Sequence, residues 1–163
     1  MYLLDTNACI RLLNGTAPRL VERLERHRAT DIALCSVVKA ELTYGAFRSS
    51  RVAENLRLLD RFYAPFVSFP FDDRCVEAYG RIRNDLERAG TPIGPNDLMI
   101  AATAVSNDLT LVTANTREVR ASNRAGPGKL GIIPIKTAGV GGNLSTNTGG
   151  RLSLRGHPPE SPA

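Results

Sequence analysis

Carboxylates that follow short apolar runs are the side chains in this sequence best suited to chemistry. Together with the polar residues beside them, the candidate site residues are Asp5, Thr6, Glu41, Asp97, Asn115 and Glu118. The apolar runs have the brevity and the polar ends of buried parallel strands. Because ligands bind beyond the carboxyl ends of such strands, residues that follow different strands can meet in one crevice. We therefore expect one acidic site assembled from distant parts of the chain.

An acidic cluster of this kind predicts a bound divalent cation. Two ionised carboxylates about 4 Å apart repel each other by about 4 kcal/mol at an effective dielectric constant of about 20, so the cluster stays ionised only with cations in it. Oxygen ligands without His or Cys suit Mg²⁺, with Mn²⁺ as the alternative, rather than zinc. A hydrated Mg²⁺ can acidify an attacking water and neutralise the leaving oxygen of a phosphodiester. The predicted chemistry is metal-assisted cleavage of a nucleic acid.

Each candidate also has a simpler local interpretation. Asp5 could only cap the helix that follows it. Glu41 could be a solvated helix residue, and Asp97 could only complement a helix dipole, which contributes about 0.3 to 1 kcal/mol. Asn115 could be a turn residue and Glu118 a surface acid. The order and spacing of all of them together favour the site.

Strand and helix patterns alternate along the first 120 residues. Strands are expected at residues 2–4, 32–35, 67–71 and 109–113. Helices are expected at residues 7–14, 18–28, 37–48, 55–62 and 73–89, and from residue 95 or 96 onward. Ser36 is the expected N-cap of the third helix, which places Glu41 within about its first turn. Strands separated by helices imply parallel crossovers, with helices on both faces of the sheet.

Charge and composition divide the 163 residues near Arg120. Residues 1–120 carry 16 Lys and Arg against 15 Asp and Glu, whereas residues 121–163 carry five basic residues against one acid. The second segment also holds 9 of the 14 glycines, 5 of the 10 prolines and no aromatic residue. We therefore expect one globular domain over residues 1–120, followed by an irregular, largely disordered Gly/Pro/Ser-rich tail over residues 121–163.

Other residue types argue against several kinds of site. Cys9, Cys35 and Cys75 lack metal-type spacing and fit buried, reduced thiols. His27 lies in a charged helix pattern and His157 in the tail, which disfavours a His-based triad or a zinc site. No run approaches the ~18 apolar residues of a membrane span, and the first residues lack the pattern of a secretion signal. We therefore expect a cytoplasmic protein.

The candidate acids stand in four segments that form a longer pattern. The segments are Tyr2-Leu3-Leu4-Asp5-Thr6-Asn7, Ser36-Val37-Val38-Lys39-Ala40-Glu41-Leu42 with Tyr44-Gly45, Thr91-Pro92-Ile93-Gly94-Pro95-Asn96-Asp97 with Ile100-Ala101, and Leu111-Val112-Thr113 with Asn115-Thr116-Arg117-Glu118. This pattern resembles the PIN-domain ribonucleases and, within them, the VapC toxins of bacterial toxin–antitoxin pairs. The resemblance covers about residues 1 to 119.

The resemblance implies both a fold and roles for the acids. The fold is α/β, a three-layer α/β/α PIN-like domain with a central, mostly parallel sheet. Asp5 and Asp97 would be the principal Mg²⁺ ligands and Glu41 the third acid of the cluster. Asn115 and Glu118 occupy the region of a fourth acid, and Glu118 would supply its carboxylate. Thr6 would orient Asp5 or the scissile phosphate.

The resemblance also implies a biological context. The chain would be an endoribonuclease toxin that cleaves RNA, with tRNA and in particular the anticodon loop of initiator tRNA as the expected substrate. It would form a homodimer, be neutralised by a VapB-type antitoxin, and reach operator DNA only through that antitoxin. Independently of the resemblance, Lys39, Arg48, Arg51 and Arg11 lie near the expected acidic edge and are candidates for holding phosphates, with ordinary solvated charges as the alternative for each.

The chain departs from the resembled pattern after Val119, where a Gly/Pro-rich segment replaces a short hydrophobic end. This departure leaves open a catalytically impaired PIN scaffold that acts as a binding module. A metal-dependent phosphatase that uses Asp5 as nucleophile is the other alternative. Such an enzyme needs a second aspartate two residues later, and Asn7 stands there.

Overall fold

The computed structural model describes residues 1–113, 145–146 and 152–153. The expected residues Asn115 and Glu118, the domain boundary at residue 120 and most of the tail lie outside the described residues. Within the tail, β5 (Ser145–Thr146) and β6 (Leu152–Ser153) are described and pair antiparallel with each other.

A four-stranded parallel sheet lies at the centre of the fold, as expected. Its strands are β1 (Tyr2–Leu4), β2 (Ile32–Cys35), β3 (Val67–Phe69) and β4 (Thr110–Val112). Their order is β3-β2-β1-β4, and all three neighbouring pairs are parallel. All four side chains of β2 are buried, as are Leu3 and Leu4 of β1. The continuous apolar runs in the sequence therefore reflect strands covered on both faces.

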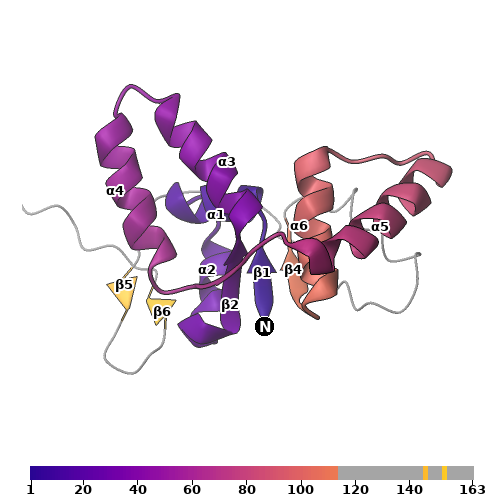
Figure 1. The fold of residues 1–163 in the computed structure, drawn as a ribbon. Helices are drawn as coiled ribbons and strands as arrows, with labels where there is room; N and C mark the ends of the chain where they lie inside the picture. The colour runs from indigo at the N-terminus through magenta and orange to yellow at the C-terminus, as the bar shows by residue number, and fades with distance from the viewer. Residues whose placement is uncertain (114–144, 147–151, 154–163) are drawn as a thin grey trace, which may run out of the picture.

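Helices connect the strands and flank the sheet (Figure 1). They are α1 (Thr6–Leu13), α2 (Pro18–Leu24), the 3-10 turn η1 (Ala29–Asp31), α3 (Ser36–Phe47), α4 (Val52–Tyr63), the 3-10 turn η2 (Asp73–Cys75), α5 (Val76–Arg88) and α6 (Pro95–Ser106). In Figure 1, α3 and α4 stand together on one side of the strands, and α5 and α6 stand together on the other. Among these helices, none has the length and apolar content needed to cross a bilayer.

Several element boundaries differ from the expectation by a few residues; the fourth helix, for example, begins at Val52 rather than at residue 55. The second helix ends at Leu24 instead of Arg28, because the N–H groups of Arg26 and His27 donate to carbonyls three residues back, at 3.2 and 2.9 Å, in place of the α-helical pattern. The third strand ends at Phe69 rather than at residue 71, and the next residue is Pro70, which has no N–H for the ladder.

Ser36 does not cap α3, contrary to the prediction. The N-cap of α3 is Cys35, and no side chain caps the first turn. The Ser36 hydroxyl instead donates to the Phe69 carbonyl at 3.3 Å. This bond ties the start of α3 to the end of β3, and Glu41 consequently lies in the second turn of α3.

Candidate active site

Asp5 stands at the point where β1 leaves the sheet and α1 begins. Its backbone N–H donates to the Val112 carbonyl at 3.1 Å, which extends the pairing of β1 with β4 by one residue. Its carboxylate Oδ1 accepts from the Ala8 N–H at 2.5 Å and so caps α1. Only 6% of the residue is exposed. The capping role that the sequence allowed is therefore real, and it fixes the orientation of a buried carboxylate at the sheet edge.

Glu41 links three elements that are far apart in the sequence. The Thr6 hydroxyl at the start of α1 donates to Glu41 Oε2, across 35 positions of sequence. The Asn96 side-chain amide in the first turn of α6 donates to Glu41 Oε1 at 2.8 Å, across 55 positions. Both carboxylate oxygens of Glu41 therefore have donors, one from each neighbouring helix. These two hydrogen bonds fix how α1 and α6 meet α3 at this edge.

Asp97 lies in the first turn of α6, as predicted, close against Gly94 of the preceding loop. A Cβ atom added at Gly94 would lie 3.2 Å from Asp97 Oδ2, so the carboxylate rests directly against this glycine. Gly94 is the N-cap of α6, with a φ of −62° that other residues also adopt. The glycine at this position therefore provides space for Asp97 rather than an unusual backbone conformation.

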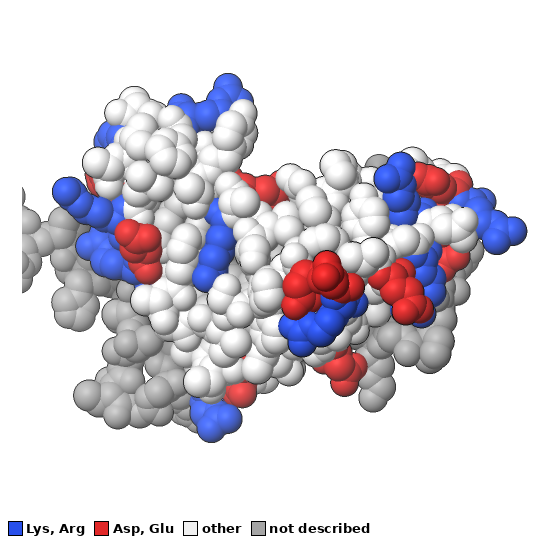
Figure 2. Space-filling view, in the orientation of Figure 1, with Lys and Arg blue, Asp and Glu red and all other residues white. Residues whose placement is uncertain are grey.

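The hydrogen bonds bring Thr6, Glu41 and Asn96 together, and with them their sequence neighbours Asp5 and Asp97. Figure 2 shows carboxylate atoms at the bottom of the notch between the α3–α4 part and α6. Within residues 1–113, however, no three His, Cys, Asp or Glu side chains lie close enough together to hold a metal ion. The described carboxylates thus share one edge of the sheet without forming a closed set of ligands.

The donor chemistry at this edge fits a hard, hydrated cation. Mg²⁺ keeps several waters and is typically bound by one or two carboxylates together with phosphate oxygens of the substrate. A site with one or two carboxylate ligands from the protein therefore needs no third acid.

The nearby cysteine thiols do not compete with the carboxylates for a metal ion. Burial raises the pKa of Cys9, and the neighbouring Asp5 carboxylate raises it further. Burial also raises the pKa of Cys35.

Asn96 is the residue at this site to which the sequence analysis gave no role. It was placed only near the start of the helix, because a Pro-Asn pair is an ordinary helix opening. No local signal in the sequence distinguishes it, because adjacent residues of a helix point about 100° apart and only the packing of α6 against α3 brings the Asn96 amide to Glu41. Its amide holds one oxygen of Glu41.

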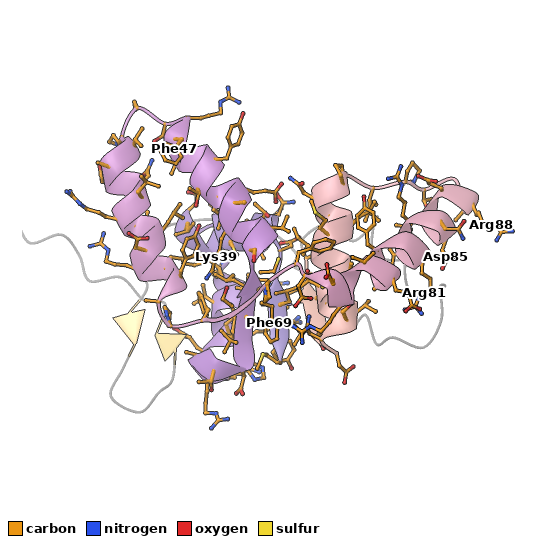
Figure 3. The ribbon with its side chains drawn as sticks, viewed as in Figure 1. Lys39, Phe47, Phe69, Arg81, Asp85 and Arg88 are labelled. Atoms are coloured by element: carbon orange, nitrogen blue, oxygen red, sulfur yellow. The ribbon has the colours of Figure 1, made fainter. Side chains whose placement is uncertain are left out.

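The four basic residues expected near the acidic edge have different surroundings. Lys39 Nζ lies 5.3 Å from the centre of the Tyr63 ring, and Figure 3 shows Lys39 on the side of α3 that faces α4. Arg48 stacks over Tyr44 at 5.9 Å, about 10 Å further along the helix axis than Glu41. Arg51 pairs with Glu54 at 3.5 Å. 

Arg11 differs from the other three because its guanidinium is partly enclosed. Its Nη1 is buried and has no hydrogen-bond partner among the residues that the structure describes. Arg48 and Arg51, by contrast, lie at the end of the α3–α4 pair that is far from the acidic edge. Two of the four expected phosphate-binding residues are therefore not at the acidic edge.

Comparisons with known proteins agree with this geometry. The family model of the PIN domain matches residues 2–123. Ribonuclease VapC2 of Rickettsia felis is 37% identical over 121 residues, which cover 74% of this chain and 90% of that protein. The tRNA(fMet)-specific endonuclease VapC of Salmonella typhimurium is 35% identical over 117 residues, which cover 72% of this chain and 88% of that protein.

A solved structure gives the same answer for the fold. The crystal structure of VapBC2 from Rickettsia felis bound to a promoter DNA fragment aligns with a TM-score of 0.70 and 35% sequence identity. The alignment covers 83% of this chain and 98% of the solved one. From its sequence, its parallel sheet and its acidic edge, this chain belongs to the PIN-domain family and, within it, to the VapC ribonucleases.

Proposed function

We propose that the protein is a Mg²⁺-dependent endoribonuclease toxin that cleaves tRNA. The observation that carries this proposal is the link from Thr6 through Glu41 to Asn96, which draws the acid-bearing starts of α1 and α6 to one place. Family membership supports the reaction, since the relatives are named ribonucleases and PIN-domain nucleases generally depend on a divalent metal. The anticodon loop of initiator tRNA is the proposed target, because one relative is named a tRNA(fMet)-specific endonuclease.

Each residue at the acidic edge receives a role in this proposal. Asp5 and Asp97 would bind Mg²⁺ and Glu41 would complete the acidic set, with the metal acidifying the attacking water and neutralising the leaving oxygen. Asp5 is suited to this because capping of α1 and burial hold it in one orientation. Thr6 and Asn96 hold Glu41 in place, and Thr6 would also orient Asp5 or the scissile phosphate.

Residues outside the described part complete the proposed site. Glu118 would supply a fourth acid, acting through water, and Asn115 would line the same region. Lys39 is the basic residue that we propose for binding the RNA backbone, because it stands in the first turn of α3 and not at the far end of the α3–α4 pair. Its side chain lies on the side of α3 that faces Tyr63 of α4. Each such phosphate contact weakens as salt concentration rises.

A VapB-type antitoxin is the proposed partner, and operator DNA would be reached only through it. The solved relatives that support this are VapBC complexes, some with DNA bound. Three large apolar side chains of α1 and α3 are exposed in this chain and could contact such a partner: Ile10, Tyr44 and Phe47 are 42%, 63% and 62% exposed. We also propose a homodimer, in line with the family resemblance.

Cleavage of total tRNA with and without a chelator tests the enzymatic proposal. We expect Mg²⁺-dependent cleavage by the wild-type protein that is lost in Asp5→Asn and in Asp97→Asn. Asp60→Asn is the matched control, because Asp60 is an exposed acid of α4 and lies away from the site. Turnover of a generic phosphatase substrate in place of RNA would favour the phosphatase alternative. A folded, antitoxin-binding protein without turnover would favour the impaired scaffold.

A further inference from the structure

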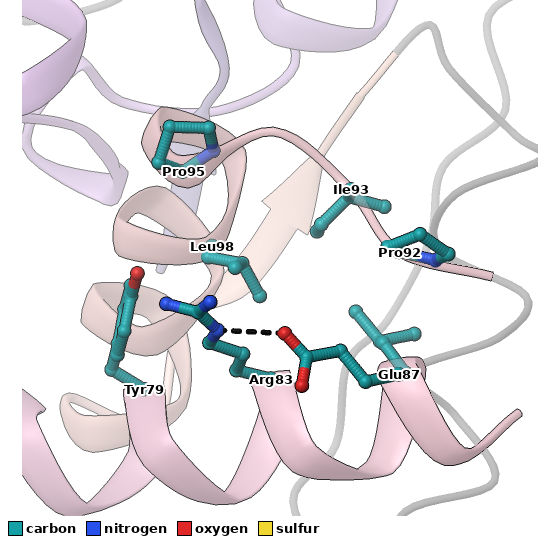
Figure 4. A pocket seen from close by; sticks show the side chains of 8 residues that line it. Tyr79, Arg83, Glu87, Pro92, Ile93, Pro95 and Leu98 are labelled. Carbon is teal, nitrogen blue, oxygen red and sulfur yellow. Dashed lines mark hydrogen bonds and ion pairs between the residues drawn. The ribbon is translucent and has the colours of Figure 1, made fainter. Parts of the chain in front are cut away.

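A pocket of about 350 Å³ lies between α5, the loop that precedes α6, and α6 itself (Figure 4). Its inner wall is apolar and is formed by Leu86, Ile93 and Leu98, of which Leu86 and Leu98 are 1% and 5% exposed. Tyr79 and Arg83 rise from successive turns of α5 toward the loop, as Figure 4 shows. The pocket therefore has an apolar interior and a polar rim on one side.

The polar rim offers a donor and an acceptor side by side. Arg83 Nε donates to Glu87 Oε1 at 2.8 Å, and both side chains are 55% exposed. An exposed ion pair of this kind contributes little to stability, so its groups are available to a ligand at small cost. An aromatic ring can stack on the face of a planar heterocycle, and a guanidinium and a carboxylate beside it can hydrogen-bond to the edge of that heterocycle.

The pocket and the acidic edge share one wall. Pro95 lines the pocket and is the first residue of α6, and the next residue, Asn96, donates to Glu41. Gly94, just before Pro95, lies against the carboxylate of Asp97. Residues of one helical turn differ by about 100° each around the axis, so the pocket beside Pro95 and Leu98 and the carboxylate of Asp97 lie on different sides of the first turn of α6, within about one helix diameter, 10 to 12 Å, of each other. The pocket is thus placed to hold a part of the substrate next to the reacting phosphate.

The size and chemistry of the pocket indicate which kind of ligand fits it. Its volume is at the low end of the about 300 to 1,000 Å³ found for small-ligand pockets, which suits one planar ring system better than a peptide helix. Sequence-specific RNA recognition mostly uses unpaired bases that stack on aromatic side chains and hydrogen-bond through their edges. Tyr79 provides a ring, and Arg83 with Glu87 provides edge contacts.

We propose that this pocket binds one unpaired base of the RNA substrate, adjacent to the scissile phosphate. Tyr79 stacks on the base, and the Arg83–Glu87 pair reads its edge and so sets a sequence preference at that position. This inference rests on the proposed ribonuclease function and deepens it. Base binding belongs to α5 and its loop, whereas phosphate cleavage belongs to the ends of β1, α3 and α6.

Two kinds of variant test the inference. In Tyr79→Ala the stacking surface is removed, and we expect kcat/KM on single-stranded RNA to fall about 5- to 150-fold, mainly through KM. In the double variant Arg83→Glu/Glu87→Arg the ion pair is kept but its polarity relative to the pocket is reversed. We expect this variant to melt like wild type and to shift the preferred base when a randomised RNA pool is cleaved. Arg81→Ala is the control, because Arg81 is an exposed cation of α5 that does not line the pocket.

The results that would overturn the inference differ from those that would overturn the ribonuclease proposal. If the wild type cleaves RNA and both pocket variants keep its rate and its base preference, the pocket does not bind the substrate. If the pocket variants instead change the oligomeric state in sedimentation, the pocket is a contact between copies and the inference is wrong.

A binding measurement covers the case in which no cleavage occurs. Each of the four nucleoside monophosphates is titrated into the wild-type protein without metal, and amide NMR shifts are followed. Shifts confined to α5 and residues 92–98, and lost in Tyr79→Ala but not in Arg81→Ala, would support a base-binding pocket even in a protein without turnover. Absence of such shifts together with absence of cleavage would overturn the inference.

Discussion

Replacement of Thr6 by Val tests whether α1 and α3 meet at the acidic edge through one hydrogen bond. Val keeps the branched shape of Thr and removes only the hydroxyl that donates to Glu41 Oε2. The Asn96 amide still donates to Oε1 at 2.8 Å, so Glu41 loses one of its two restraints. Thr6→Ser is the matched control, because it keeps the hydroxyl.

The expected cost follows from the partners and their burial. A hydrogen bond to a charged group contributes about 1.5 to 3 kcal/mol and a typical neutral one about 0.5 to 1.5 kcal/mol. Because both side chains here are only partly buried, we expect a contribution of about 1 to 1.5 kcal/mol, where the two ranges meet. This corresponds to a fall in melting temperature of about 3 to 5 °C for a domain of this size. If the same restraint orients Glu41 during the reaction, kcat/KM falls about 5- to 12-fold.

A double-mutant cycle with Glu41→Ala isolates the interaction. Urea unfolding of the wild type, Thr6→Val, Glu41→Ala and the double variant should give a coupling free energy of about 1 kcal/mol, because Thr6 has no partner to lose once Glu41 is truncated. A coupling free energy below about 0.3 kcal/mol, within the range of independent sites, would refute the convergence of α1 and α3 at this point.

Three further variants test other parts of the structure. Gly94→Ala should lower cleavage several-fold while the melting temperature stays the same or rises, because the new Cβ would lie 3.2 Å from Asp97 Oδ2 in a backbone conformation that Ala adopts. Phe62→Ala should lower the free energy of unfolding by about 3 to 5 kcal/mol in urea titration, because Phe62 is 1% exposed. The Arg74 guanidinium lowers the pKa of the Asp72 carboxyl, so Asp72 stabilises the fold above its unfolded-state pKa of about 3.9 and loses this effect as pH falls through its lower folded-state pKa. Asp72→Asn should therefore melt below wild type at pH 7, with a difference that narrows toward pH 3 in thermal scans; a difference independent of pH would contradict this role.

The sequence alone was sufficient for the element types, the parallel sheet and the family. Short apolar runs with polar ends predicted all four strands of the main sheet. The central strand β2 is buried throughout and is apolar for that reason, whereas the edge strand β3 is only half-buried and its Ser68 is exposed. The loop Pro92-Ile93-Gly94-Pro95 and the helix start at Pro95 were also predicted, since proline fixes its own φ and fits the first position of a helix. The acids Asp5 and Asp97 were expected at the starts of helices, and the structure places them there.

Only the tertiary structure shows which side chains form hydrogen bonds with each other. The donors to Glu41 come from 35 positions before it and 55 positions after it, and no local pattern selects Asn96 over its neighbours for this contact. Ser36 was predicted to cap α3, but its hydroxyl donates to the carbonyl of Phe69 at the end of β3. Local propensity specifies backbone conformation over a few residues, whereas the partner of a side chain depends on how whole helices pack and in which register.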